Sequence, residues 1–259
     1  MIRVRDIWKR YGRLGVLKGL DLDIFDGETL VILGRSGVGK SVLLRQIIGL
    51  ETPDRGYVEV DDKRITDMNE RQRLRDPSIK RMGMLFQSSA LFDSLNVGDN
   101  ISFYLRQHEP TLDESEVNDR VADALKMVGL EDTQGKMPSE LSGGMRKRAA
   151  LARLIVYRPQ IILYDEPTTG LDPITAAQIN ELINRTKEEL KATSIVVTHD
   201  IRSALEVGDR LAFHHDGKIA YVAPKNEFMH SNNPILLDFF NNAIIEDNYY
   251  QIIRKNGKS

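Results

Sequence analysis

The sequence runs Thr29-Leu30-Val31-Ile32-Leu33 and continues directly into Gly34-Arg35-Ser36-Gly37-Val38-Gly39-Lys40-Ser41. The first five residues are all β-branched or apolar, which is typical of a strand buried on both faces. Beyond the glycine-rich stretch, the apolar residues of positions 43–48 recur at helical spacing until Gly49, which predicts a helix of about three turns. This part of the chain therefore predicts a strand, a loop and a helix in succession, which is the unit from which α/β folds are built.

The glycine-rich loop fits the Walker A pattern, and its place between a strand and a helix separates it from a flexible glycine turn. The glycines let backbone N–H groups turn inward, and the helix start adds a positive dipole end, so the loop suits phosphate oxygens. We expect Lys40 to reach the β- and γ-phosphates of ATP and Ser41 to bind Mg²⁺ through its hydroxyl. The predicted nucleotide-binding residues here are Gly34, Arg35, Ser36, Gly37, Val38, Gly39, Lys40, Ser41 and Val42.

A second strand carries an acidic pair at its end. Four apolar residues, 161–164, lead into Asp165-Glu166, which matches the Walker B pattern. An acidic pair in this place is more often a solvated loop or a helix cap, but the phosphate loop favours the functional interpretation. We expect Asp165 to hold Mg²⁺ and Glu166 to act as the general base toward the attacking water.

The rest of the chain predicts the organisation of the fold. The first thirty residues alternate short β-type runs with turns, and residues 57–60 and 64–65 continue this pattern, so we expect an antiparallel set of strands. From Ser88 to about Arg158 the pattern is mostly helical, with one apolar face made by Val117, Val121, Ala124, Leu125 and Val128. A helix over 176–190 then separates strands 161–164 and 194–197, which argues for parallel pairing.

We therefore predict an α/β fold: a P-loop ATPase core with a mainly parallel sheet and helices, an N-terminal antiparallel β subdomain, and a helical subdomain at about 88–158 inserted in the core. Residues 1–230 form this domain and residues 231–259 a C-terminal extension. Residues 211–222 predict a hairpin, because Asp216-Gly217 suits a type I′ turn. His214 and His215, adjacent in its first strand, point to opposite faces and cannot share a metal.

Composition excludes several classes of function. The 259 residues include 41% hydrophobic and 29% charged ones, with a formal net charge of -2, so binding to nucleic acid is disfavoured. The basic residues Arg146, Lys147, Arg148 and Arg153 are interpreted as the solvated face of a helix. The absence of cysteine excludes disulfides and thiolate chemistry. No apolar run is long enough to span a bilayer and the start lacks a signal-peptide pattern, so we expect the chain to stay in the cytoplasm.

Leu141-Ser142-Gly143-Gly144-Met145 and the basic helix that follows it resemble the signature loop of ABC transporter ATPases. Ser142 is a good N-cap, and the two glycines leave N–H groups bare at a helix start, which suits an anion. A turn that only caps a helix is the alternative. The resemblance implies that Ser142, Gly143 and Gly144 close on the ATP held by a second copy of the chain, so that two copies form a homodimer.

Other positions resemble the same family. Tyr11 stands where the family has an aromatic residue that stacks on adenine; Trp8 is its rival, unless it belongs to the core. Gln87, at the end of the strand predicted over 81–86, resembles the glutamine that touches Mg²⁺ or the catalytic water and senses the transmembrane partner. The resemblance also implies that Asp172 links the two sites of the dimer and that His199 contacts the γ-phosphate.

Met145 stands where the family at large favours glutamine. Together with residues 39–42, 83–87, 90–95 and 172–175, it resembles the ATPases of Mla-type phospholipid transport systems. This implies a permease dimer that crosses the membrane, accessory and substrate-binding subunits, and a place on the cytoplasmic face of the inner membrane. The alternatives are the ATPase of another ABC importer or exporter, and a non-transport ABC protein that acts on nucleic acid or ribosomes.

For two segments, the sequence allows either contact with a partner or packing within the chain itself. Leu91 and Phe92 either meet a permease or belong to the helical core. In the extension, Leu236, Phe239, Phe240 and Ala243 share a helical face, followed by Tyr249, Tyr250, Ile252 and Ile253. This segment either docks on a second subunit or an accessory protein, or folds back on its own domain.

Overall fold

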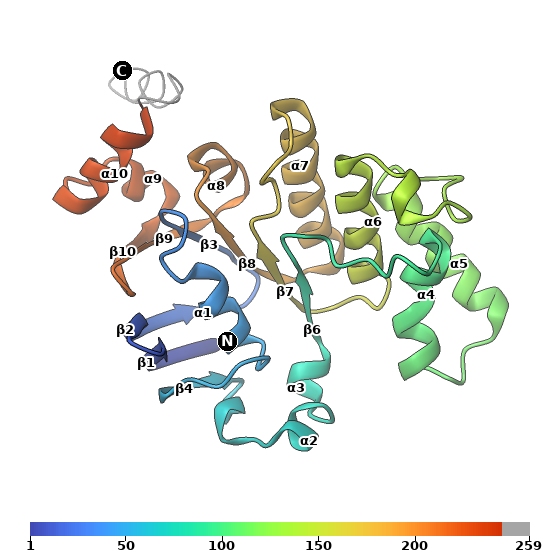
Figure 1. The fold of residues 1–259 in the computed structure, drawn as a ribbon, viewed down its shortest axis with the longest axis horizontal. Coiled ribbons are helices and arrows are strands. Elements are labelled where there is room, and N and C mark those ends of the chain that lie inside the picture. Colours follow the sequence, from blue (N-terminus) through green and yellow to red (C-terminus); the bar gives the residue numbers. More distant parts are fainter. Residues whose placement is uncertain (245–259) are drawn as a thin grey trace. The chain divides into compact units, whose positions relative to one another are not determined.

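The computed structural model describes residues 1–244 (Figure 1). It divides the chain into two compact units, one made of residues 1–74 with the chain from Ile195 onward, and one made of Arg75–Ser194. Among the described residues, no helix is long and apolar enough to cross a membrane. The helical subdomain predicted at about 88–158 lies inside the second unit.

The N-terminal strands of the first unit form an antiparallel sheet, as predicted. Its strands are β1 (Ile2–Tyr11), β2 (Leu14–Ile24), β4 (Arg55–Val60) and β5 (Lys63–Arg64). They lie in the order β2-β1-β4-β5, and each neighbouring pair is antiparallel. Ile2, Val4 and Ile7 alternate with exposed or half-buried residues along β1, so one face of this sheet packs inward.

The glycine-rich loop leaves a different sheet. Its strand β3 (Thr29–Leu33) is buried at every residue and pairs in parallel with β9 (Arg210–His215). Strand β10 (Lys218–Pro224) completes an antiparallel hairpin with β9, and β8 (Thr193–Thr198) follows β3 in the strand order. The predicted hairpin turn is confirmed, because Asp216 and Gly217 both have positive φ, 44° and 75°.

Short helices complete the first unit. Helix α1 (Lys40–Ile47) is the helix predicted after the loop, about one turn shorter than expected, and Gly49 follows it with φ 78°. The other helices are the 3₁₀ turn η1 (Ile65–Asp67), α2 (Glu70–Arg73), α8 (Ile201–Val207), α9 (Lys225–Met229) and α10 (Pro234–Ile244).

In the second unit, β6 (Met82–Leu85) and β7 (Ile161–Asp165) pair in parallel. Its helices are α3 (Pro77–Lys80), α4 (Val97–His108), α5 (Glu114–Met127), the 3₁₀ turn η2 (Pro138–Glu140), α6 (Gly143–Ile155) and α7 (Pro173–Leu190). The predicted apolar face of α5 is confirmed as buried. Helix α7 begins three residues earlier than predicted, because Asp172 caps it and Pro173 occupies its first position.

Helix α10 settles part of the question about the C-terminal extension. Leu236, Phe239 and Phe240 are buried in their own unit. The ring centroids of Phe239 and Phe213, which belongs to β9, are 4.9 Å apart. The ring centroids of Phe240 and Phe228, which belongs to α9, are 6.2 Å apart. Of the two alternatives, these three side chains therefore fold back on their own domain. Tyr249, Tyr250, Ile252 and Ile253 lie outside the described residues.

Substitution of Phe240 tests this packing. Phe240→Ala removes a buried ring and leaves a cavity, so we expect the free energy of unfolding of the purified chain to fall by about 3 kcal/mol. Ile235→Ala, on the exposed side of the same helix, is the matched control and is expected to cost less than about 1 kcal/mol. Equal urea midpoints for the parent and Phe240→Ala would contradict the observed packing of α10.

Candidate functional site

The phosphate loop is held by close backbone contacts within the first unit. A Cβ atom on Gly34 would lie 2.6 Å from the carbonyl oxygen of His214, and one on Gly39 would lie 2.6 Å from Cγ1 of Val16. Gly39 also has φ 106°, a conformation that disfavours any side chain. Both positions therefore require glycine, for reasons of space at Gly34 and of space and backbone conformation at Gly39.

The loop offers donors to an anion. Lys40 is buried, and its ammonium donates to the carbonyl oxygens of Gly34 and Arg35 over 2.8 and 2.9 Å. Gly39 is the N-cap of α1 and has no side chain to accept from the first N–H groups, and the first turn holds no acidic residue. A positive helix end beside a buried ammonium fits the phosphates of a nucleotide.

His199 lies near the start of this loop, because β3 and β8 are neighbours in the sheet and end side by side. It follows β8, and the N–H of Gly34 donates to the carbonyl oxygen of Thr198 over 3.3 Å. The His199 side chain is exposed, and Asp200 behind it caps α8 by accepting from the N–H of Arg202. The first unit therefore brings the predicted histidine and the start of the predicted phosphate loop to one place.

Tyr11 and Trp8 lie on β1 and are both exposed, by 45% and 38%. The alternative that Trp8 belongs to the core is wrong: its ring covers Gly19, and its indole N–H donates to the carboxylate of Asp6 over 2.7 Å. The Tyr11 hydroxyl donates to the carboxylate of Glu51. Partial burial and this bond raise the pKa of the Tyr11 hydroxyl. An exposed ring held at its hydroxyl suits stacking on a flat base.

His214 was predicted only to face away from His215. It is 1% exposed, and neither of its ring nitrogens has a hydrogen-bond partner among the described residues, whereas His215 is exposed. Burial lowers the pKa of His214 from 6.5 to about 4, and the nearby charges of Lys40 and His215 act in the same direction. A buried neutral imidazole therefore lies behind the phosphate loop, which the sequence pattern did not reveal.

The second unit holds the acidic pair at the end of β7. Asp165 and Glu166 are both buried, and Glu166 has φ 48°, which is unusual for a residue with a side chain. The hydroxyl of Thr169 donates to a carboxylate oxygen of Glu166 over 3.0 Å. A strained backbone together with a hydrogen-bonded buried carboxylate is typical of a functional residue. Sequence reasoning placed the pair but missed Thr169.

The predicted signature loop starts α6 in the same unit. The hydroxyl of Ser142 accepts from the N–H of Met145 over 3.3 Å, so Ser142 is the N-cap, as predicted. Gly144 packs against Thr175, where a Cβ atom would lie 2.6 Å from the Thr175 methyl group. Asp172 accepts from the N–H groups of Ile174 and Thr175, both over 3.0 Å. Helix α6 and the start of α7 therefore support each other closely.

The basic residues after the signature loop correct one prediction. They are not simply a solvated face: Lys147 is buried, and its ammonium donates to the backbone carbonyl oxygen of Gln87. Arg148 donates to the carbonyl oxygen of Gly129 over 3.2 Å, at the end of α5. Only Arg146 points outward as expected. These cations bond to backbone carbonyl oxygens of the same unit. The helical pattern of the sequence does not predict such partners.

Phe92 and Leu91 are not fully buried in the helical core. Phe92 is exposed and packs against Phe103, with ring centroids 4.9 Å apart, and Leu91 is half-buried. The alternative in which they are ordinary core is therefore wrong for Phe92. Leu91 and Phe92 lie four and five residues after Gln87 along the chain.

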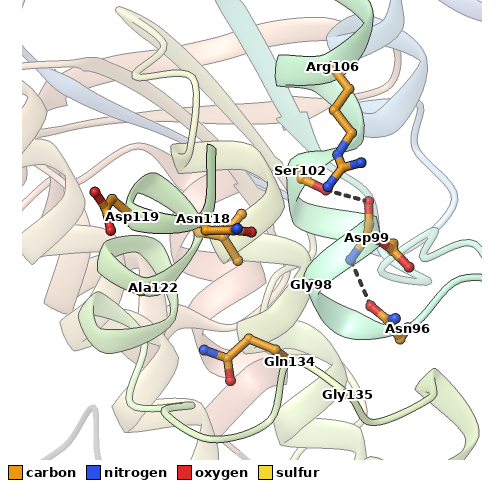
Figure 2. Close-up of a pocket in the computed structure, with 11 residues that line it drawn as sticks. Asn96, Gly98, Asp99, Ser102, Arg106, Asn118, Asp119, Ala122, Gln134 and Gly135 are labelled. Carbon is orange, nitrogen blue, oxygen red and sulfur yellow. Dashed lines mark hydrogen bonds between the residues drawn. The ribbon is translucent and has the colours of Figure 1, made fainter. Parts of the chain in front are cut away.

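A separate cavity of about 520 Å³ lies between α4 and α5 (Figure 2). Figure 2 shows Asn96, Asp99, Ser102 and Arg106 on one side and Asn118 and Asp119 on the other. Asn96 caps α4 by accepting from the N–H of Asp99 over 2.7 Å. None of the predicted site residues lines this cavity, so the predicted chemistry lies elsewhere.

Known proteins resemble the chain over most of its length. The family model described as ABC transporter matches residues 17–169. A probable ribonucleotide transport ATP-binding protein of Mycobacterium leprae is 39% identical over 240 residues, which are 93% of this chain and 68% of the relative. The chloroplastic protein trigalactosyldiacylglycerol 3 of Arabidopsis thaliana is 38% identical over 255 residues, which are 92% of this chain and 73% of the relative.

A solved structure agrees with these matches. It is a dimeric ATP-binding cassette in a post-hydrolysis state with ADP and phosphate, 32% identical, with a TM-score of 0.79 over 87% of this chain and 99% of that one. The chain therefore belongs to the ABC transporter family as an ATP-binding subunit. It hydrolyses ATP, and the hydrolysis is coupled to transport.

The buried imidazole generates a prediction about stability. His214 stays neutral in the folded chain down to about pH 4, whereas a histidine of the unfolded chain takes up a proton near pH 6.5. The free energy of unfolding therefore keeps its full value above pH 6.5 and decreases as the pH falls below 6.5. Between pH 7.5 and pH 5 this histidine is expected to cost about 2 kcal/mol. His214→Leu should remove that part of the loss in urea titrations at the two pH values.

His215→Leu is the matched control, because the neighbouring imidazole is exposed. It should keep most of the pH dependence of the parent, because burial is the main cause of the lowered pKa of His214. If His214→Leu loses as much stability as the parent between the two pH values, the buried neutral state of His214 is refuted.

Proposed function

We propose that this ABC ATPase energises the movement of phospholipids between membranes, as the ATPase subunit of an Mla-type system. The observation that carries the proposal is the similarity, over 92% of the chain, to a plant relative whose name is that of a glycerolipid. Met145 in the signature loop supports it, since the resemblance to Mla-type ATPases includes this departure from glutamine. The similarity to the mycobacterial relative makes nucleotide transport the competing substrate class.

In this proposal the first unit binds ATP. The backbone N–H groups of the phosphate loop and the Lys40 ammonium hold the β- and γ-phosphates, and Tyr11 stacks on adenine. His199 contacts the γ-phosphate, because its strand end lies beside Gly34. The anchoring of the Tyr11 hydroxyl on Glu51 supports a fixed stacking platform.

Oxygen-bearing side chains are the proposed groups for metal and water. The predicted metal ligands Ser41, Gln87 and Asp165 each offer an oxygen atom, which suits Mg²⁺. Mg²⁺, when bound, neutralises charge on the phosphate oxygens. Glu166 then accepts a proton from the attacking water, and the Thr169 hydroxyl orients its carboxylate. The buried place of Glu166 supports this role.

A second copy of the chain completes the site. The signature loop, Ser142 to Gly144, closes on the γ-phosphate held by the other copy, and Asp172 links the two sites. The Ser142 oxygen accepts from the N–H of Met145, so its own proton remains for an anion. The thioether of Met145 offers no amide, which leaves the backbone N–H groups as the main donors. ABC cassettes form dimers and associate with permease subunits, and the solved relative is dimeric.

The complex is then peripheral to the cytoplasmic face of the inner membrane, held there by its permease. Phe92, exposed after Gln87, is the side chain that would meet the permease. Accessory and substrate-binding subunits complete the assembly, and nucleic acid is not a partner.

Glu166→Gln tests the general base. The amide keeps the size of the side chain but cannot accept the proton, so we expect kcat for ATP hydrolysis to fall by about 100-fold or more. ATP affinity should change less than about threefold, and gel filtration with ATP should show a stable dimer. Glu131→Gln, an exposed glutamate of the same unit, is the control. Normal turnover by Glu166→Gln would exclude this role.

Purification of the whole complex tests the substrate class. The tagged chain is extracted from membranes in detergent, and its companion subunits and bound small molecules are identified by mass spectrometry. We expect a permease and phospholipid at a stoichiometric amount, together with ATPase activity that phospholipid vesicles change. Nucleotides as the transported species, or stimulation by nucleic acid without any membrane partner, would overturn the proposal.

A further inference from the structure

A lysine of α6 holds the backbone of the loop that contains Gln87. Lys147 is 5% exposed, and its ammonium donates to the carbonyl oxygen of Gln87. Burial of an ammonium group is costly unless the charge is bonded and compensated. This hydrogen bond therefore joins the helix of the signature loop to the backbone of the glutamine.

Arg153 of the same helix holds the next residues of this loop. Its guanidinium donates to the carbonyl oxygens of Ala90 and Ser89 over 2.7 and 3.2 Å. Ser89 and Ala90 both have positive φ, 67° and 48°, although neither is glycine. Two such residues in succession persist only where their surroundings hold them, and the cations of α6 do so here.

The charge of Lys147 also interacts with the charges of the acidic pair. Burial lowers the pKa of its ammonium, while the negative charges of Asp165 and Glu166 favour the charged form. Burial also lowers the pKa of the Arg153 guanidinium. Both cations therefore hold the loop, and the charge of Lys147 also interacts with the predicted catalytic carboxylates.

We propose that Lys147 is a positioning residue for ATP hydrolysis, which holds the backbone of Gln87 in place. Through this side chain, the position of the signature helix sets the geometry of the glutamine. The proposal rests on the roles given above to Gln87, Asp165 and Glu166. It does not depend on which substrate is transported.

The test separates positioning from a purely structural role of a buried lysine. Lys147→Met removes the charge and the bond, and Lys147→Arg keeps a cation and a donor. Lys126→Met makes the same chemical change at an exposed lysine of α5 and is the matched control. For each full-length variant we would measure kcat and KM for ATP and the hydrogen exchange of the backbone amides of residues 87–90.

We expect Lys147→Met to lower kcat about tenfold or more while KM changes less than about threefold, because the proposed role concerns the hydrolysis step and not the binding of ATP. Amides 87–90 should exchange faster, Lys147→Arg should recover kcat to within about threefold of the parent, and Lys126→Met should behave as the parent. Lys147→Gln, neutral and shorter, replaces the methionine variant if that one does not fold.

Three results would overturn the proposal: a kcat of Lys147→Met within about twofold of the parent, unchanged exchange at residues 87–90, or an arginine variant as impaired as the methionine variant. Failure of the site assignment is distinguishable, because it appears as normal turnover of Glu166→Gln whatever Lys147 does.

Discussion

The passage from β3 into α1 is the constraint on which the first unit depends. The strand is buried on every residue, so it cannot shift, and the backbone must turn directly beside the carbonyl oxygen of His214. Only glycine allows this approach at Gly34, and only glycine suits the left-handed backbone at Gly39. The same turn delivers the Lys40 ammonium and the bare N–H groups of the helix start to one place. The predicted phosphate binding is therefore a direct consequence of how a buried strand ends.

The second unit solves a different problem, which is to hold carboxylates in a strained and buried position. Glu166 has a left-handed backbone at the end of β7, and Thr169 bonds its carboxylate. Helix α6 supports the neighbouring loop with Lys147 and Arg153. Strain of this kind is stable only when contacts hold it: Thr169 bonds to Glu166, and helix α6, whose first residues are the signature loop, bonds to the strained residues Ser89 and Ala90. A single element thus serves both the predicted dimer contact and the predicted catalytic groups.

Helix α10 illustrates how an apolar face finds its cover. The spacing of Leu236, Phe239 and Phe240 showed that one side of the helix needs burial, but either a partner or the chain itself satisfies that need. The aromatic side chains of Phe213 and Phe228 lie close enough to provide it. Hydrophobic burial has no direction of its own, and so a pattern in one segment does not name the surface that it meets.

The succession of strands and helices along the chain and the position of the glycine-rich loop followed from the sequence alone, because they depend on short-range patterns: alternation, helical spacing, and glycine where the backbone must bend. The acidic pair was predicted from its place at the end of a strand, and the signature loop from its resemblance to a family. The tertiary structure decided what each cation and each histidine faces. The sequence predicted that Lys147 belongs to the solvated face of a helix, yet it is buried and bonds to the carbonyl oxygen of Gln87, sixty positions away. His214 read as one of two ordinary histidines, yet it is buried behind the phosphate loop. Such contacts join residues far apart in the chain, and local periodicity contains no information about them.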